Sequence, residues 1–534
     1  MKEKLKLGKK KIPVKKPKKE KILRIINNIV SILILVLGIG IFCLSFYIEK
    51  FLSKVSFYEI VYYLISPKTG FGSSVFYEGV KACGGLFISL LIILLIPIIN
   101  SKRVKISLQI RNKDIKLYPV FYKYKFVYSL IVLAMSAVFI MFKLGAHTYI
   151  KNNLTSGDIY ETSYVNTNEV KIKFPEKKKN LIILYLESME ASLVSPENGG
   201  VFSKSRIPEL EKLALNNISF SNTDKLGGGN VASNATWTIA ATVASTSGTP
   251  VLSDIGNSYD KIEKFMPNVV TLGDVLNKEG YNLELIQGTG KYFAGTDKYY
   301  ITHGNYEILD YYEMIDRELV PEGYYVWEGV EDKKVLEFSK DEILKLAEEE
   351  KPFSVSIFTM DTHFKDGYVD SSCSNKFSEH LSNAYACSSK MVNEFINWLK
   401  KQDFYKNTTI VLIGDHLNMN TNYFSEYPEY NRTIYNTFIN SSVTDVSHTK
   451  NRLFSAYDLY PTILASVGAE IEGDKIGFGV NLFSGKKTMF EELGINEFNT
   501  ELLKRSTYYS KYITNYTEIG KLNEEKNSKN NVKD

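Results

Sequence analysis

Four apolar segments of this 534-residue chain end abruptly at polar or charged side chains. The residues that close them, in chain order, are Glu187, Gln287, His363 and the pair Asp415–His416. A short apolar run bounded in this way is typical of a buried parallel strand. Open parallel sheets bind their ligands at the carboxyl ends of the strands. We therefore expect these side chains to meet at one edge of a sheet and to form one site.

The segments between these strands predict the fold class. From Ile172 to about Ser484, apolar strands alternate with helical patterns such as Pro208–Leu215 and Ser378–Lys400. This alternation predicts an α/β domain over 172–484 with a mainly parallel central sheet flanked by helices. For 485–534 we expect terminal helices near Glu497–Lys511, followed by a disordered tail rich in Asn, Lys and Glu.

Three uncharged apolar runs, at 29–47, 82–99 and 126–142, have about the length that spans a bilayer. Twelve Lys and Arg against two Glu lie in 2–24, and eight against one Asp lie in 101–125. Because basic residues stay on the cytoplasmic side, this bias predicts a multi-pass cell-membrane protein whose domain after Phe142 is extracytoplasmic. A cleaved signal peptide is a poor alternative for the first run, since two more runs follow it.

The same features divide the chain into regions. We expect a basic cytoplasmic tail at 1–24, a transmembrane region at 25–145 and a linker at 146–171. Within the membrane region, Phe57–Ile65 is too short to span and predicts an interfacial helix at the outer surface. The basic tail alone suggests nucleic acid, but the rest of the chain is net acidic, so we expect no nucleic-acid partner.

Glu187, Asp415 and His416 are candidate metal ligands. Two oxygen ligands and one imidazole suit Mn²⁺ or Zn²⁺ better than Ca²⁺, which prefers an all-oxygen shell. The alternative is that each carboxylate only caps a following helix. The convergence of several ionisable groups on one sheet edge favours the functional interpretation.

The glycine-rich segment Gly227–Pro250 contains the candidate nucleophile, Thr236. A helical pattern begins near Trp237, so Thr236 lies near a helix N-terminus, where anions are favoured. Metal coordination would lower the pKa of its hydroxyl and activate it. Two alternatives remain: Thr236 is only the N-cap, or Thr238 is the nucleophile.

Histidines and cysteines supply the remaining candidates. His363 could bind a phosphate oxygen or protonate a leaving group, or it could only pack at a strand end. His303 lies beside a glycine and is the weaker candidate. Cys373 and Cys387 fall in the part expected outside the cytoplasm, where a disulfide is permitted, although two free thiols remain an alternative.

Several motifs carry a resemblance to a known family. They are LESME, NATWTIAATVASTSGTP, FAGTDKYYITHG, MDTHFKDGY, IGDH and AYDLYPTILASVG. With these motifs the chain resembles the membrane-anchored phosphoglycerol transferases of the sulfatase/alkaline phosphatase superfamily, which include lipoteichoic acid synthase. The WTIAATVAS and FAG…THG stretches look most similar to the branch that decorates osmoregulated periplasmic glucans, and Cys373 with Cys387 resembles a cysteine pair of that branch.

The resemblance implies an activity and a set of site residues. It implies glycerol phosphate transfer from phosphatidylglycerol to an envelope glycan or polymer through a covalent threonine intermediate. Thr236 matches the nucleophile, His363 matches a histidine that binds the substrate phosphate, and the metal ligands match Glu187, Thr236, Asp415 and His416. The implied metal is Mn²⁺, with Zn²⁺ or Mg²⁺ as alternatives.

The chain departs from the family at the pocket for the head group. Gln287, Ala294 and Thr296 stand where lipoteichoic acid synthase has His, Trp and Arg. Gln287, Thr296 and His303 are the side chains that we expect to bind the substrate. Phosphoethanolamine transfer, phosphodiester hydrolysis and a non-catalytic envelope-binding protein with a degenerate site remain alternatives. A formylglycine sulfatase is disfavoured, because no cysteine stands at the nucleophile position.

Overall fold

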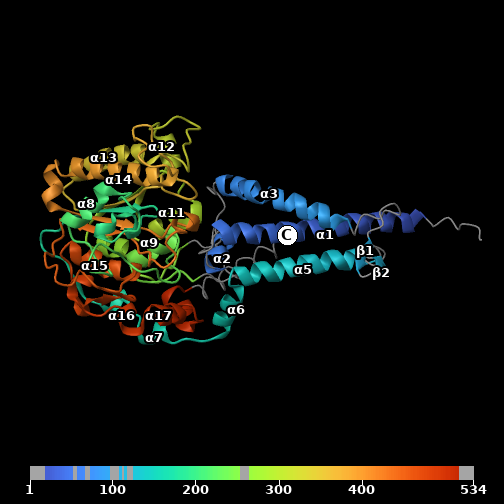
Figure 1. Ribbon diagram of the computed structural model, residues 1–534. Coiled ribbons are helices and arrows are strands. Elements are labelled where there is room, and N and C mark those ends of the chain that lie inside the picture. Colours follow the sequence, from blue (N-terminus) through green and yellow to red (C-terminus); the bar gives the residue numbers. More distant parts are fainter. Residues whose placement is uncertain are drawn as a thin grey trace, which may run out of the picture. The chain divides into compact units, whose positions relative to one another are not determined.

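The structure is a computed structural model that describes residues 18–51, 57–65, 73–96, 107–110, 113–116, 124–252 and 264–515. The chain forms two compact units (Figure 1). One comprises Met1–Lys50 and Ser73–Leu144, and the other comprises Phe51–Gly72 and Gly145–Asp534. The second unit therefore combines the short segment Phe51–Gly72 with the chain from Gly145 onward.

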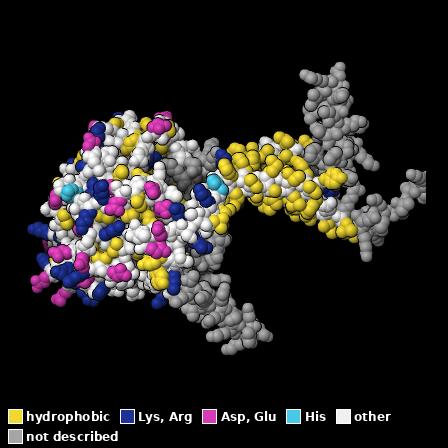
Figure 2. Space-filling model, turned by 90° about the horizontal axis from the view of Figure 1, so that it is seen from below, with side chains coloured by type: hydrophobic (Ala, Val, Ile, Leu, Met, Phe, Trp, Pro, Cys, Tyr) yellow, Lys and Arg dark blue, Asp and Glu magenta, His cyan; other side chains and the backbone are white. Residues whose placement is uncertain are grey.

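The first unit consists of long apolar helices and a small hairpin. Its elements are α1 Lys18–Phe51, α3 Ser73–Leu95, α5 Lys125–Lys143, β1 Ser107–Ile110 and β2 Lys113–Lys116. Figure 2 shows hydrophobic side chains gathered over the visible face of these helices. Leu33 of α1 and Val138 of α5 are 62% and 71% exposed. Contiguous apolar surface of this kind suits contact with lipid.

Two of the predicted spans match helices that are long and apolar enough to cross a membrane. These helices cover Ile25–Ile48 and Lys125–Lys143. The third predicted span, 82–99, is only partly helical: α3 ends at Leu95, and its apolar part Gly79–Leu95 is shorter. The helix ends here because Ile96 precedes Pro97, whose ring disfavours helical backbone in the residue before it.

Two predictions at the chain ends need revision. The predicted basic tail overlaps α1, which already begins at Lys18, and residues 1–17 lie outside the described residues. The predicted disordered tail beyond residue 515 also lies outside them. The predicted domain end at 484 is too early, because Phe490 and Phe498 of the following helices are buried in the core.

A six-stranded sheet in the order β6-β5-β7-β4-β8-β9 forms the centre of the second unit. All neighbouring strands are parallel except β8 and β9. This confirms the predicted α/β class. The strands are β4 Asn180–Leu186, β5 Asn282–Gln287, β6 Glu307–Leu309, β7 Phe353–Phe358, β8 Thr408–Gly414 and β9 Asn436–Ile439.

Helices cover both faces of the sheet, as the alternation of residues along β4 requires. Ile182 and Leu184 face one core, and Ile183 and Tyr185 face the other. Because successive side chains of a strand point to opposite faces, a strand buried on both sides is apolar throughout. One core includes residues of α8 Pro208–Asn216, α13 Asp332–Ala347 and α14 His380–Leu399, and the other includes residues of α9 Thr238–Ser247, α10 Leu272–Lys278 and α15 Leu459–Ser466.

The predicted linker 146–171 is wrong, because this segment is folded into the second unit. It forms α6 Ala146–Leu154 and α7 Ile159–Thr162. Tyr160 is 1% exposed, and its hydroxyl donates to the Leu502 carbonyl at 2.8 Å.

The remaining elements of this unit include α2 Phe57–Ile65, β3 Ile172–Lys173, α11 Thr296–Thr302, α12 Tyr311–Asp316, β10 Glu470–Ile471, β11 Lys475–Ile476, β12 Gly479–Val480, α16 Met489–Leu493 and α17 Ile495–Leu502.

Cys373 and Cys387 form a disulfide with a Cα–Cα distance of 5.6 Å. Cys387 lies in α14, and Cys373 lies in the loop between β7 and that helix. The bond therefore ties the loop that follows β7 to a helix packed against the sheet. Cys43 and Cys83 of the first unit are free thiols.

Candidate metal centre and nucleophile loop

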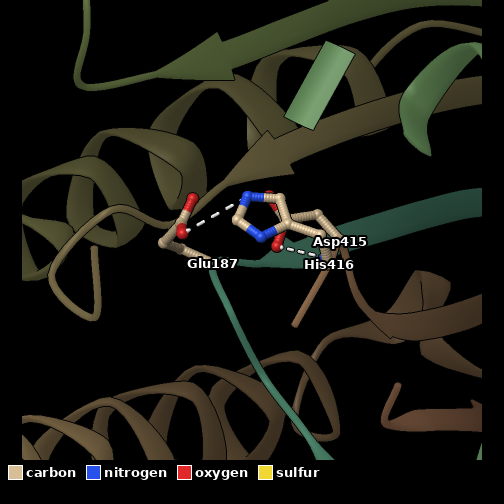
Figure 3. A group of neighbouring side chains, drawn as sticks. All are labelled: Glu187, Asp415 and His416. Atoms are coloured by element: carbon tan, nitrogen blue, oxygen red, sulfur yellow. Dashed lines mark hydrogen bonds and ion pairs between the residues drawn. The ribbon is translucent and has the colours of Figure 1, made fainter. Parts of the chain in front are cut away.

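Glu187, Asp415 and His416 form a compact cluster at the carboxyl edge of the sheet (Figure 3). One ligand atom from each lies within 4.8 Å of the others, and all three residues are buried. The His416 Nε2 atom is 3.6 Å from Glu187 Oε1 and 3.4 Å from Asp415 Oδ2. Two carboxylates and an imidazole are thus arranged around one point.

The pairing of β4 with β8 brings these residues together. The two strands are adjacent and parallel, with Leu186 opposite Gly414. Glu187 and Asp415 each follow the last paired residue, so they leave the sheet side by side. The backbones after the two strands pack closely at this point. A Cβ on Gly414 would lie 1.9 Å from the Met189 carbonyl oxygen, so only glycine fits there.

The helix-capping alternative does not describe the two carboxylates. Asp415 Oδ1 accepts hydrogen bonds from the backbone N–H groups of Ser188 and His416, each at 2.8 Å. Glu187 Oε1 accepts one from the Ser188 hydroxyl. These donors belong to the turns that follow β4 and β8, which carry the candidate ligands and are called the ligand loops below. The bonds therefore orient the carboxylates toward each other and do not cap a helix.

The donor set fits a divalent cation. Glu187 Oε2 and Thr236 Oγ1 are buried and have no hydrogen-bond partner among the described residues. A buried polar atom without a partner is costly, and coordination of an ion would remove that cost. A ligand set of oxygen and imidazole suits Mn²⁺ or Zn²⁺.

The electrostatics of the cluster favour the binding of a positive charge. Burial lowers the pKa of His416, but the charges of Asp415 and Glu187 outweigh it and raise the value to about 9. Burial, followed by the charge of Glu187, raises the pKa of Asp415 to about 7. Both groups thus hold a proton more tightly than usual, and a bound cation would displace these protons.

The segment from Gly227 to Trp237, which contains the candidate nucleophile and is called the nucleophile loop below, runs directly into α9. The helix begins at Thr238, and its N-cap is Trp237, which makes no side-chain cap. Thr236 precedes the cap, and its buried Oγ1 receives no helix N–H, so the structure does not show it as an N-cap. Thr238 Oγ1 lies 3.4 Å from His416 Nε2. The structure therefore brings Thr238, the rival nucleophile, within reach of the cluster, and Thr236 lies two residues before it in the chain.

Glycine allows this loop to lie flat against the strand edge. A Cβ on Gly228 would lie 1.8 Å from the Ile434 carbonyl oxygen, a separation that no side chain permits. The backbone of Gly229 instead pairs with Ile434 in an isolated bridge. The glycine-rich approach is thus explained by close contact with the backbone that leads into β9.

His363 lies in the loop that follows β7, beside the ligand cluster's strands. Its Nδ1 atom is 3.7 Å from the carboxylate of Glu328. Burial lowers the pKa of His363, but the Glu328 carboxylate and the charge of Glu187 leave it above its usual value. The neighbouring Thr362 donates its hydroxyl to the Glu187 carbonyl at 2.5 Å, which joins the loops after β7 and β4.

The predicted head-group residues already have partners within the domain. Gln287 donates from Nε2 to the Thr289 carbonyl at 3.1 Å, and Thr296 donates to the Phe293 carbonyl at 2.9 Å. The ring nitrogens of His303 lie 2.9 Å from Asp274 Oδ2 and 2.7 Å from the Phe265 carbonyl. His303 is 3% exposed, so its contacts describe a residue that holds a loop in place.

A buried network that the sequence did not reveal ties the two ligand loops together. Arg432 forms an ion pair with Glu190, which is fully buried, and also donates to the Asn418 carbonyl at 2.8 Å. Glu190 accepts from the Asn418 N–H at 2.9 Å, and the Asn418 side chain donates to the Tyr385 hydroxyl at 2.8 Å. That hydroxyl donates to the Ser188 carbonyl at 3.1 Å. The one side chain of this network that lies in a motif noted in the sequence is Glu190, the last residue of LESME.

The network acts on the residues next to the candidate ligands. Ser188 and Glu190 flank the turn after Glu187, and Asn418 follows His416 by two residues. The guanidinium of Arg432 also lies 3.9 Å from the centre of the Phe424 ring. Outer contacts of this kind orient metal ligands and tune their affinity.

Comparisons with known proteins place this domain. The Sulfatase family model matches residues 179–469. Phosphoglycerol transferase I of Escherichia coli O6:K15:H31 is 31% identical over 280 residues, which cover 51% of this chain and 35% of that protein. Phosphoglycerol transferase I of Xanthomonas axonopodis pv. citri is 30% identical over 251 residues, or 46% of this chain and 34% of that protein. The chain spans about a third of the length of these curated relatives.

Solved structures that resemble this chain share little sequence identity with it. The lipoteichoic acid synthase LtaP of Listeria monocytogenes has a TM-score of 0.48 and 17% identity, and covers 62% of this chain and 81% of its own. The lipooligosaccharide phosphoethanolamine transferase A of Neisseria meningitidis has a TM-score of 0.47 and 12% identity, and covers 83% and 84%. Because the family model matches more than half of the sequence, the chain belongs to the sulfatase family.

Proposed function

We propose that this protein transfers glycerol phosphate from phosphatidylglycerol to a hydroxyl of an envelope glycan or polymer. The cluster of Glu187, Asp415 and His416 beside a threonine loop carries the proposal. The curated relatives named phosphoglycerol transferase I support the choice of donor. We further propose that the second unit works outside the cytoplasm, as the distribution of basic residues predicts.

One divalent cation, Mn²⁺ by preference and Zn²⁺ or Mg²⁺ as alternatives, would be held by Glu187, Thr236, Asp415 and His416. Bound there, it would act as a Lewis acid on the phosphate oxygens and favour the ionised threonine hydroxyl. The unpartnered Oε2 of Glu187 and Oγ1 of Thr236 support this ligand set. Asp415 keeps its orientation through the Ser188 and His416 N–H groups.

In the first half of the reaction, Thr236 Oγ1 attacks phosphorus and loses its proton to solvent. The bond from Oγ1 to phosphorus forms as the bond from phosphorus to the diacylglycerol oxygen breaks. His363 donates a proton to that leaving oxygen. Despite burial, the Glu328 carboxylate, 3.7 Å from Nδ1, and the charge of Glu187 raise the pKa of His363, which favours the protonated ring that this role requires.

In the second half, the acceptor hydroxyl attacks the threonine-linked phosphorus. The now neutral His363 takes the hydroxyl proton, the bond from phosphorus to Oγ1 breaks, and Thr236 regains a proton from solvent. The product is a phosphodiester on the acceptor, and the enzyme is restored. The network of Glu190, Arg432 and Asn418 would keep the ligand loops fixed throughout.

The test offers fluorescent phosphatidylglycerol and phosphatidylethanolamine separately to the full-length chain. Labelled diacylglycerol should form only from phosphatidylglycerol, and mass spectrometry should find a glycerophosphoryl adduct on Thr236. Thr236→Ala should abolish the adduct, while Thr238→Ala should leave it detectable. Release from phosphatidylethanolamine alone would reject the donor, and an adduct on Thr238 would reject the nucleophile.

A further inference from the structure

Helix α2 ends 80 residues before Gly145, where the main part of the second unit begins, and it packs beside the nucleophile loop. Tyr62 of this helix is fully buried and belongs to the same core as Tyr185 of the central strand. Its ring lies 5.4 Å from the Trp237 ring, and its hydroxyl donates to the Ala294 carbonyl at 2.5 Å. One side chain of α2 therefore contacts two loops at the carboxyl edge of the sheet.

Trp237 makes this contact relevant to the reaction. It stands between the two candidate nucleophiles, Thr236 and Thr238, and is 2% exposed. Its backbone is extended, with φ −139° and ψ 158°, and it makes no side-chain cap to α9. Asn499 and Tyr457 hold the loop by hydrogen bonds at Ser233, and at Trp237, which has no capping bond, packing of the indole against Tyr62 restrains it.

The second contact of Tyr62 restrains a strained position. Ala294 adopts a left-handed conformation with φ 55° and ψ 16°, which is unfavourable for a residue with a Cβ. Such conformations persist where the surroundings hold them in place. The hydrogen bond from Tyr62 holds the Ala294 carbonyl and so couples the loop after β5 to the nucleophile loop.

The rest of α2 is also anchored on this unit. Tyr58 donates its hydroxyl to the Leu503 carbonyl at 3.1 Å, and its ring lies 4.8 Å from that of Tyr149. Glu59, between the two tyrosines, is 3% exposed. The face of α2 that bears these side chains is therefore covered by protein, which the prediction of a purely interfacial helix did not include.

We propose that α2 is a structural part of the active site and that Tyr62 is a positioning residue, which holds Trp237 and thereby places the Thr236 hydroxyl for attack. The reactive geometry then depends on a segment that lies between two candidate membrane helices in sequence. Two experiments test this proposal. The first, the exchange arm, measures hydrogen exchange of the nucleophile loop and needs no substrate. The second, the kinetic arm, measures turnover of phosphatidylglycerol and therefore rests on the proposed function.

The exchange arm compares backbone hydrogen exchange in residues 234–242 of the full-length chain. Tyr62→Ala removes both the ring that packs on Trp237 and the hydroxyl bond to Ala294, and exchange in this segment should become at least about fivefold faster, the effect of losing one buried hydrogen bond. The matched control is Tyr281→Ala, which removes a ring and a hydroxyl bond to the Lys179 carbonyl at the opposite edge of the sheet. Equal exchange in the two variants would overturn the proposal.

The kinetic arm uses Tyr62→Ala with phosphatidylglycerol. A displaced reactive group costs up to about a hundredfold in rate, so kcat should fall at least about tenfold while metal content and the donor KM stay near those of the wild type. Full kcat in a folded Tyr62→Ala variant would overturn the positioning role. If the wild type itself fails to use phosphatidylglycerol, the proposed function fails, and the exchange arm still decides the role of Tyr62.

Discussion

Replacing Arg432 by methionine should destabilise the second unit and weaken its metal site together. The guanidinium forms an ion pair with Glu190, which is 0% exposed, and donates to the Asn418 carbonyl. Methionine leaves the Glu190 carboxylate buried without its cation, which costs about 3–5 kcal/mol of unfolding free energy. Because Glu190 and Asn418 hold the loops of the ligands, metal affinity should fall about 10- to 100-fold.

The assay measures chemical unfolding and metal affinity of the same purified protein. Glu190→Gln together with Arg432→Met removes both charges and should recover most of the stability, since the amide oxygen of the new side chain can still accept from the Asn418 N–H. Arg452→Met is the matched control, because Arg452 pairs with Glu491 at 2.8 Å and is equally buried. If Arg432→Met weakens metal binding no more than Arg452→Met does, the network has no specific effect on the ligands.

Four further outcomes follow from the same contacts. Asp415→Ala should lower metal occupancy and abolish turnover, and near-normal turnover at saturating Mn²⁺ would contradict the ligand set. Thr236→Ser keeps a hydroxyl and should retain part of the transfer rate, whereas an inactive serine variant would question the nucleophile. Burial, followed by the charges of nearby carboxylates, raises the pKa of Glu284 to about 8. Folded Glu284 thus binds its proton more tightly than the unfolded chain, so stability should fall as pH rises from about 4.5 to about 8, by up to about 1.4 kcal/mol per unit. Glu284→Gln should flatten this slope in unfolding measurements, and an unchanged slope would refute the assignment. A reporter fused after Lys143 should be active only outside the cytoplasm, and cytoplasmic activity would reject the topology.

Local patterns were sufficient for the elements that build the sheet. The apolar runs ending at Glu187 and Asp415 became adjacent parallel strands, and α2 and α14 lie where their patterns predicted them. A buried strand or an amphipathic helix can be recognised from consecutive residues, because the spacing of its apolar side chains reflects which of them must be buried. The parallel sheet then brings strand ends together, which is why the proximity of Glu187, Asp415 and His416 could be predicted without coordinates.

The predicted linker shows where local patterns fail. Residues 146–171 are polar and mixed, and nothing within them signals a buried tyrosine. Tyr160 is buried because its ring packs against Phe478 and Tyr509, and the Leu502 carbonyl, 342 residues away, accepts its hydroxyl bond. The same holds for Arg432, whose partner Glu190 is 242 residues distant.

The sequence by itself therefore determined the sheet, its flanking helices and the residue types at its carboxyl edge. Tertiary structure alone decided which distant side chains hold that edge in place: Arg432 beneath the ligand loops and Tyr62 against Trp237. The physical reason is that a strand's burial is a property of neighbouring residues, whereas a buried ion pair or a ring contact exists only after chain segments far apart in sequence have packed together.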